Sequence, residues 1–166
     1  MSEIAAEGAE SVSPEIQEKL LSPFITATGT ALGEMASTEV VVRAMSRGPG
    51  RHPSGNVCAE LRFTSGIEGS VVLVFPEGTA EALAKRMLAG VSTEVDAQLI
   101  RDCMGEIGNV VAGQAKALLA ASSYHFTFSL PKVAEFEDFQ PPLVPCLVVA
   151  FNSDFGEFAL ELFLKL

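Results

Sequence analysis

The residues best suited to chemistry in this sequence are an acid and an amide inside one long helical pattern. Glu106 and Asn109 lie three positions apart, Asp102 lies four positions before Glu106, and Gly113 lies four positions after Asn109. Residues at these spacings share one face of a helix. A carboxylate can pair with a cation, and a carboxamide can both donate and accept hydrogen bonds. The sequence therefore predicts a polar helix face suited to receiving a partner or a substrate.

The other side of the same helix carries apolar residues at helical spacing, which is typical of a side packed on a core. These residues are Ile100, Ile107, Val111 and Leu118. Cys103 also falls on this apolar side, and we expect it to be a core thiol. Spacing alone leaves open the alternative that Glu106 and Asn109 form an ordinary solvated surface.

Two glycines interrupt this helix, and each costs about 1 kcal/mol relative to alanine in a helix interior. Gly105 borders the acid–amide face, where a bare backbone would let a partner approach closely. Gly108 lies toward the packed side, where it would allow close contact between helix and sheet. A functional interpretation therefore fits Gly105 better than Gly108.

Three helices are predicted to support this site. Their approximate ranges are 13–37, 79–88 and 94–121. In the first, Pro23 is expected to break or kink the helix, because proline removes a backbone donor and clashes with the preceding turn. Gly90 is expected to end the second helix. Thr93 with Asp96 resembles an N-terminal cap for the third.

About six strands accompany the helices, and neighbouring strands are mostly linked by hairpins, which predicts a largely antiparallel sheet of the α+β class. The predicted strands are 39–44, 57–64, 70–75, 124–130, 147–151 and 158–165. Segments 46–55 and 131–145 are predicted as loops. Residues 1–12 are acidic, small and polar, and we expect a disordered tail before a single domain over 13–166.

The composition limits the partners that the protein could have. Of 166 residues 48% are hydrophobic, and the formal net charge is −10, so nucleic acid and anionic membranes are poor partners. No apolar run approaches the roughly 20 residues of a membrane span, and no signal peptide is evident, so we expect a cytoplasmic protein. Three cysteines in apolar contexts indicate reduced thiols. The sequence contains no cluster of His and Cys residues, so no metal site is expected. These cysteines are Cys58, Cys103 and Cys146.

An internal similarity raises the question of duplication. Residues 29–36 resemble residues 113–120, and each stretch precedes a predicted strand. This match places Ser22 and Ile25 at the positions of the acid–amide pair. Two interpretations stay open: a chance likeness of small-residue helices, or a duplicated fold whose first copy lacks the pair.

The pattern Asp102-x-x-x-Glu106-x-x-Asn109, followed by Gly113, resembles the signature of the CheC/CheX/FliY phosphatases of bacterial chemotaxis. A single copy of the pattern resembles the CheX layout within that group. The resemblance runs from about Phe24 to Leu166. It includes the hairpin 57–75, the helix ending at 86–88, the core 105–109 and the strand from 124 to Leu130 and Pro131.

This resemblance implies an activity and roles for the site residues. It implies hydrolysis of the phospho-aspartate of a CheY-type response regulator, with Glu106 and Asn109 as the active pair. Asn109 would position the attacking water, and Glu106 would pair with a lysine of the partner. The remaining positions, Asp102, Gly105 and Gly113, would contact the partner.

The resemblance also implies the protein's requirements and leaves two other functions open. No cofactor of its own is expected, because the response regulator would supply Mg²⁺, and a homodimer is expected. One alternative is a non-catalytic module of the same fold that binds receiver domains or a flagellar-switch-like assembly. The other is a structural dimer whose polar helix face has no function.

Overall fold

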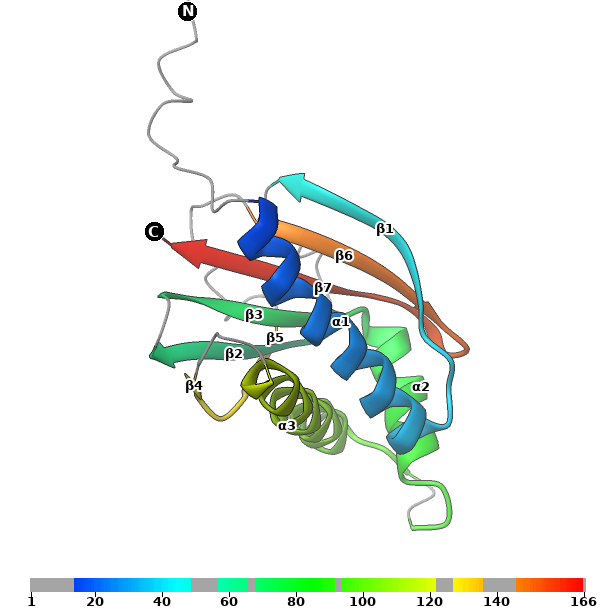
Figure 1. The fold of residues 1–166 in the computed structure, drawn as a ribbon. Coiled ribbons are helices and arrows are strands. Elements are labelled where there is room, and N and C mark those ends of the chain that lie inside the picture. The colour runs from blue at the N-terminus through cyan, green and yellow to red at the C-terminus, as the bar shows by residue number, and fades with distance from the viewer. Residues whose placement is uncertain are drawn as a thin grey trace, which may run out of the picture.

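The structure is a computed structural model that describes residues 14–48, 57–65, 68–91, 94–121, 127–135 and 146–165. The predicted tail over residues 1–12 lies outside the described residues. The described chain contains three helices and seven strands (Figure 1). In chain order they are α1 Pro14–Ala36, β1 Val41–Gly48, β2 Val57–Ser65, β3 Glu68–Phe75, α2 Glu77–Met87, α3 Ala97–Ala120, β4 Thr127–Phe128, β5 Lys132–Glu135, β6 Cys146–Ser153 and β7 Gly156–Lys165.

The strands form one antiparallel sheet in the order β1-β6-β7-β3-β2-β4, and β5 pairs with β2 beside β4. This arrangement confirms the predicted α+β class. The sheet has one strand more than predicted, because β5 lies in the segment 131–145 that was expected to be a loop. The predicted strand 124–130 is reduced to β4 within the described residues, and residues 124–126 lie outside them. The predicted loop 46–55 begins later than expected, since β1 continues to Gly48.

The strand order supports the duplication hypothesis. The fold can be divided into two units, one of α1, β1, β2 and β3 and the other of α3, β5, β6 and β7. If β1 is exchanged with β5, β2 with β6 and β3 with β7, the same order of these six strands is obtained, read from the opposite edge of the sheet. The central contact is β3 against β7, and each unit's first strand pairs with the second strand of the other unit. The two helices α1 and α3 are therefore equivalent elements, and they lie side by side on the sheet.

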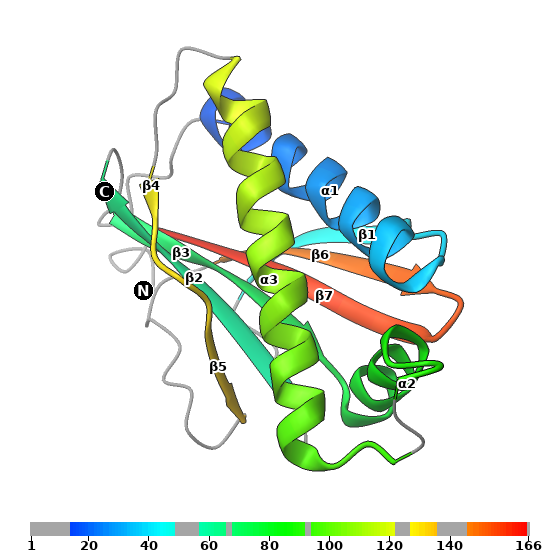
Figure 2. The same cartoon turned by 90° about the horizontal axis from the view of Figure 1, so that it is seen from below.

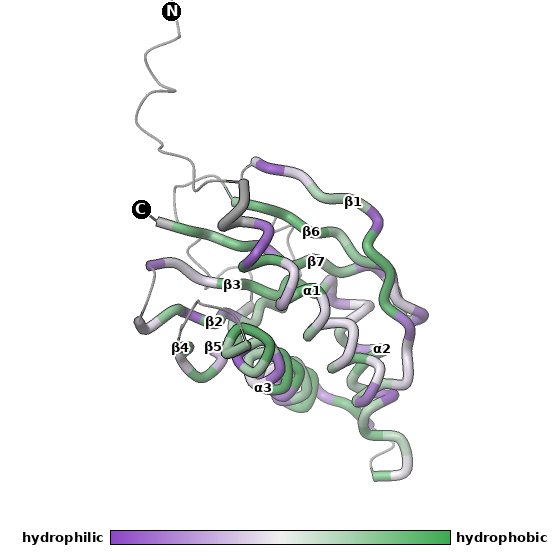
Figure 3. The backbone as a smooth tube through the Cα atoms, in the orientation of Figure 1, coloured by the Kyte–Doolittle hydropathy of each residue, from purple (hydrophilic) through white to green (hydrophobic). Residues whose placement is uncertain are grey.

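All three helices cover one face of the sheet (Figure 1). Alternate strand residues face them, and most of the core lies between the two layers. The central strands β6 and β7 are hydrophobic over much of their length (Figure 3). A second, smaller cluster on the opposite face includes Val72, Val74 and Phe163. No helix of the described residues is long and apolar enough to span a bilayer.

Pro23 does not break α1, so the break expected there is wrong, while a kink at this position stays a prediction. Leu20, Phe24 and Ala27 on either side of Pro23 are all fully buried. An interior proline costs about 3 kcal/mol, and burying one large apolar side chain offsets about 1.5–3 kcal/mol. Packing against the sheet therefore keeps the helix continuous from Pro14 to Ala36.

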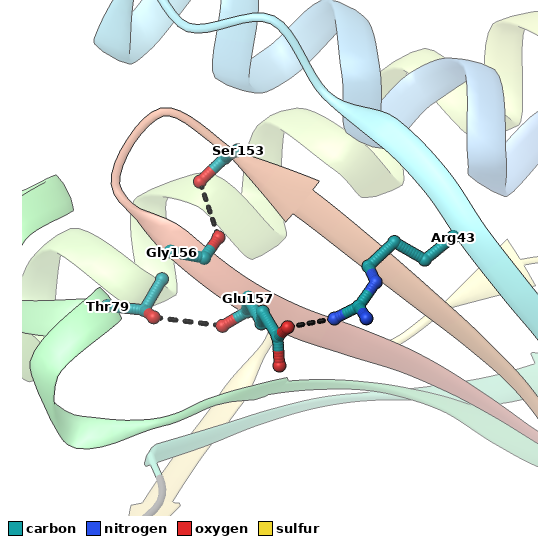
Figure 4. Close-up of polar contacts among 5 residues, drawn as sticks. All are labelled: Arg43, Thr79, Ser153, Gly156 and Glu157. Atoms are coloured by element: carbon teal, nitrogen blue, oxygen red, sulfur yellow. Dashed lines mark hydrogen bonds and ion pairs between the residues drawn. The ribbon is translucent and has the colours of Figure 1, made fainter.

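The β6–β7 hairpin anchors both the edge strand and α2 (Figure 4). Arg43 of β1 reaches across β6 to form an ion pair with Glu157 of β7. Thr79 Oγ1 donates to the Glu157 carbonyl at 2.9 Å, and Ser153 Oγ donates to the Gly156 carbonyl at 2.8 Å. Gly156 has a φ of +127°, and an added Cβ would lie 2.5 Å from Thr79 Oγ1. Glycine is therefore required where α2 meets the turn.

The three cysteines are buried and form no disulfide with one another, as the sequence predicted. Burial, followed by the nearby Glu161 carboxylate, raises the pKa of both Cys58 and Cys146 to about 12. Burial also raises the pKa of Cys103, with smaller effects from Asp102 and Glu106. These thiols remain neutral near pH 7, and a neutral thiol is a poor nucleophile.

Candidate functional site

The acid–amide pair lies on α3, and the ends of this helix are well defined. Asp96 caps α3, since its side chain accepts a hydrogen bond from the Leu99 amide at 2.8 Å. The helix begins at Ala97 rather than at residue 94, because the cap is Asp96. Thr93, the other predicted capping residue, lies outside the described residues. This start places the acid–amide pair in the middle of the helix.

The predicted core side of α3 is confirmed in its middle and wrong near its end. Ile107 and Val111 are fully buried, and Ile100 is partly buried against the core. Leu118 is 43% exposed, and the buried positions of the last turns are Ala115 and Leu119. The last buried positions, Val111, Ala115 and Leu119, follow one another at spacings of four, so the buried stripe rotates around the helix and away from Leu118.

The face of α3 opposite its buried side is exposed to solvent and contains the predicted polar residues. Asp102, Glu106, Asn109 and Gly113 are all exposed. Asp102 accepts a hydrogen bond from Gln98 Nε2 at 2.9 Å. The side chains of Glu106 and Asn109 have no hydrogen bond or ion pair among the described residues. Their polar atoms are therefore available to an incoming molecule.

A groove of about 580 Å³ runs along this face of α3. One wall consists of α3 residues, among them Asp102, Glu106 and Asn109. The other wall is the segment from Leu130 to Val133, which leads from β4 into β5 and lies beside α3 in Figure 2. Gly113 is exposed on the same helix face but does not line the groove. The acid–amide pair therefore lies in a recess with one apolar wall.

The two interior glycines of α3 allow this second wall to pack against the helix. A Cβ added at Gly108 would lie 3.2 Å from two ring carbons of Pro131 and 3.6 Å from the Ala59 side chain. This confirms the prediction that Gly108 permits close packing. A Cβ added at Gly105 would lie 3.1 Å from a methyl group of Val133. Gly105 thus has a neighbour in its own chain, and it also lines the groove, where partner contact stays a prediction.

Several groove residues were missed by sequence reasoning. Gln98 and Arg101 extend the helix wall, and Leu130, Pro131 and Val133 form the other wall. The residues after β4 were assigned to a loop because a strand of four residues is too short to show a period of two. The apolar pair at 133–134, flanked by charged residues, was the only local signal for β5.

The groove can bind a molecule and orient it, and its described lining contains no Ser, Thr, Cys, His or Lys side chain that could act as a nucleophile. The lining includes the carboxylates of Asp102 and Glu106, the carboxamide of Asn109 and the side chain of Arg101. Cys103 points away from it into the core. The described residues contain no group of three or more His, Cys, Asp or Glu side chains that could hold a metal ion. Such a site can orient water or another protein's side chains and suits chemistry completed by a partner.

Comparison with known proteins identifies related structures. The family model described as chemotaxis phosphatase CheX matches residues 57–152. A chemotaxis protein CheX from Desulfovibrio desulfuricans is 26% identical, with a TM-score of 0.76 over 89% of this chain and 99% of that chain. CheX from Vibrio vulnificus is 24% identical, with a TM-score of 0.74 over 89% and 99% of the two chains.

A third similar structure was solved with a partner. It is the CheX–CheY–BeF3–Mg²⁺ complex from Borrelia burgdorferi, which is 19% identical with a TM-score of 0.67 over 89% of this chain and 98% of that chain. No curated protein matches the sequence of this chain closely enough to count as a relative.

Proposed function

The chain belongs to the CheX family of chemotaxis phosphatases, whose model matches more than half of it, and we propose that it hydrolyses the phospho-aspartate of a CheY-type response regulator. The observation that carries this proposal is the acid–amide pair of α3. Both side chains point outward into a groove, and neither is engaged within the described chain. A pair held in this way can enter another protein's active site.

Asn109 is the residue that positions the attacking water. Its amide oxygen can accept a hydrogen bond from the water and its NH₂ group can donate one, which fixes the water in line with phosphorus without adding negative charge. The water oxygen then bonds to phosphorus while the bond from phosphorus to the aspartate oxygen breaks. The products are inorganic phosphate and the free carboxylate. GTPases use a glutamine amide in a comparable way.

Glu106 docks and orients the partner. A carboxylate that approached the phosphoryl group itself would be repelled, so Glu106 is assigned to the lysine of the receiver's active site. Glu106 and Asn109 are one helical turn apart, so an ion pair at the first directs the second toward the phosphoryl group. The receiver also supplies Mg²⁺ in this scheme. The Borrelia neighbour, crystallised with CheY, BeF3 and Mg²⁺, supports a partner of this class.

Asp102, Gly105 and Gly113 are proposed to form the surrounding contact surface. Asp102 is held by Gln98, Gly105 lines the groove, and Gly113 is exposed with no atom within 4 Å of an added Cβ. Because no contact among the described residues requires a glycine at position 113, a contact with the partner is a physical reason for its presence.

Replacing Gly113 by Ala tests this contact against a closely matched control. Gly29 of α1 is the residue that the internal sequence similarity matches to Gly113, and no described atom lies within 4 Å of an added Cβ there either. Each Ala substitution is expected to raise the free energy of unfolding by about 0.5–1 kcal/mol, since glycine is unfavourable in a helix. Only Gly113→Ala should also weaken receiver binding, by roughly threefold or more, measured by titration calorimetry. Equal binding by both variants would remove Gly113 from the contact surface.

The enzymatic proposal is tested with the purified protein and phosphorylated receivers from the same cell. Receivers are phosphorylated with acetyl phosphate and Mg²⁺, freed of the donor, and mixed with the protein while inorganic phosphate is measured. Phosphate release faster than the receiver's own hydrolysis supports the phosphatase. Binding of the phosphorylated receiver without faster release would support the non-catalytic module instead. No binding to any receiver would overturn both.

We also propose a homodimer that forms through β1, and a cytoplasmic location where receivers are found. Within the described residues β1 pairs only with β6, so its other edge is open. Val41, Val42 and Met45 on this strand are 53%, 40% and 60% exposed. An edge strand with exposed apolar side chains is suited to pairing with a second copy.

The dimer proposal predicts that Met45→Asp yields a monomer. A charge on the open apolar edge would be desolvated and unpaired on association, which disfavours the dimer. Light scattering of the wild-type protein should give twice the chain mass, and of the variant a single chain mass. Val91→Asp is the control, because Val91 is 82% exposed on the turn that follows α2 and is not part of β1. A monomeric wild type at micromolar concentration would contradict the proposal.

A further inference from the structure

One large apolar side chain stands at the edge of the proposed active groove. Leu130 is 83% exposed, and it lines the groove that contains Glu106 and Asn109. The other large exposed apolar residues of the described chain do not line this groove. They are Val41, Val42, Met45, Val91 and Leu118. A single exposed leucine is ordinary, so the argument depends on where this one lies and how it is held.

The backbone on both sides of Leu130 is fixed. Ser129 donates its amide hydrogen to the Arg62 carbonyl at 2.8 Å, and the Arg62 amide donates to Ser129 Oγ at 3.0 Å. On the other side the Pro131 ring rests on Gly108, so closely that an added Cβ there would come within 3.2 Å. The backbone that carries Leu130 is therefore anchored on both sides, so the backbone part of the ordering cost on binding is largely met in advance.

The location of Leu130 determines what would cover it. Any protein whose active site receives Glu106 and Asn109 must enter the groove, and Leu130 is part of the opposite wall. The polar helix face would orient this partner, while a leucine side chain contributes affinity through burial of apolar surface. An exposed apolar residue on an anchored backbone, beside polar groups that require orientation, is typical of a binding anchor.

We propose that Leu130 is the apolar anchor of the receiver-docking surface, and that it inserts into an apolar depression next to the receiver's phosphorylated aspartate. This inference rests on the proposed function and deepens it. Leu130 binds the receiver equally before and during hydrolysis, so its contribution appears in KM and in the dissociation constant. It is a specificity residue, because only receivers with a complementary depression beside the phosphorylation site can accept it.

The proposal is tested with Leu130→Ala, Leu130→Met and, as a control, Leu118→Ala. Leu118 is an exposed leucine of α3 on the side away from Asn109. Leu130→Ala should raise KM for the phosphorylated receiver roughly 10-fold, equivalent to about 1.4 kcal/mol, with kcat within about twofold of wild type. Leu130→Met, which conserves volume, should restore most of the affinity. Leu118→Ala should change neither parameter.

The outcomes separate this inference from the function on which it rests. If wild type hydrolyses the phosphorylated receiver and Leu130→Ala leaves KM unchanged, the anchor is refuted and the phosphatase stands. A fall in kcat at unchanged KM, or a change only in thermal stability or oligomeric state, also refutes it. If wild type binds without hydrolysis, the dissociation constant replaces KM as the test. If wild type binds no receiver, both proposals fail.

Discussion

Replacing Asn109 by Ala is expected to lower kcat for receiver dephosphorylation by at least about 100-fold, a loss of roughly 2.7 kcal/mol of transition-state stabilisation. The amide is exposed, lines the groove and has no partner among the described residues, so its removal leaves no unsatisfied group in the core. The protein should therefore fold normally. Receiver affinity should stay within about threefold of wild type. The water that the Asn109 amide positions stabilises the transition state more than it stabilises the complex with the receiver.

The measurement is single-turnover phosphate release at saturating phosphatase, accompanied by titration of the receiver to obtain affinity. Gln114→Ala is a matched control, since it removes another carboxamide from α3, one that donates to Glu34 of α1 at 3.2 Å rather than lining the groove. It should leave kcat unchanged. An Asn109→Ala variant that keeps the wild-type rate would show that water is positioned by another group.

The parts of the site that follow from local sequence were predictable. A helical period places Glu106 and Asn109 on one exposed face whatever the rest of the chain does, and Asp96 caps that helix through its own side chain. The β2–β3 and β6–β7 hairpins are also local, and the structure confirms both pairings. Local patterns therefore identified the helix wall of the groove.

The second wall depends on contacts that are distant in sequence. β5 pairs with β2 over four residues, Val57 with Glu135 through Glu60 with Lys132, and no local period marks so short a strand. Gly108 leaves room for the Pro131 ring where α3 packs against the segment before β5. Nothing in the sequence around either residue indicates that the two are in contact. Burial similarly overrides the local effect of Pro23 in α1. Long-range packing, rather than local propensity, made the recess around the acid–amide pair.

The symmetric strand order raises the question of a second candidate site on α1, and the residues of α1 answer it. The strand order makes α1 equivalent to α3, yet Ser22 is an exposed hydroxyl and Ile25 is half-buried. Neither can supply the carboxylate or the amide. Helix α1 therefore occupies the position equivalent to α3 but lacks the acid–amide pair, and we expect all activity to depend on α3.

The second large effect is expected at Glu106. Glu106→Lys should weaken receiver binding at least about 10-fold, because it places a positive charge opposite the receiver's active-site lysine in a contact from which water is excluded. The side chain is exposed and makes no internal bond in the described chain, so stability should be unchanged. Glu18→Lys, on the exposed surface of α1, is the control for the change of two charge units and should reduce affinity only slightly.

A charge exchange distinguishes a direct ion pair from a general electrostatic effect. If Glu106 pairs with the receiver's lysine, a receiver with Glu at that lysine should bind Glu106→Lys more tightly than it binds wild type. Wild-type affinity should also fall with rising salt, and it should fall less for Glu106→Gln, in which the charge is absent. The lysine also takes part in the receiver's own chemistry, so the measurement is binding rather than hydrolysis. Binding is measured with a receiver that carries an unreactive phosphoryl analogue. If the affinity for the altered receiver does not depend on the charge at position 106, a direct ion pair is excluded, and of the acid–amide pair only Asn109 keeps an assigned role in the receiver's active site.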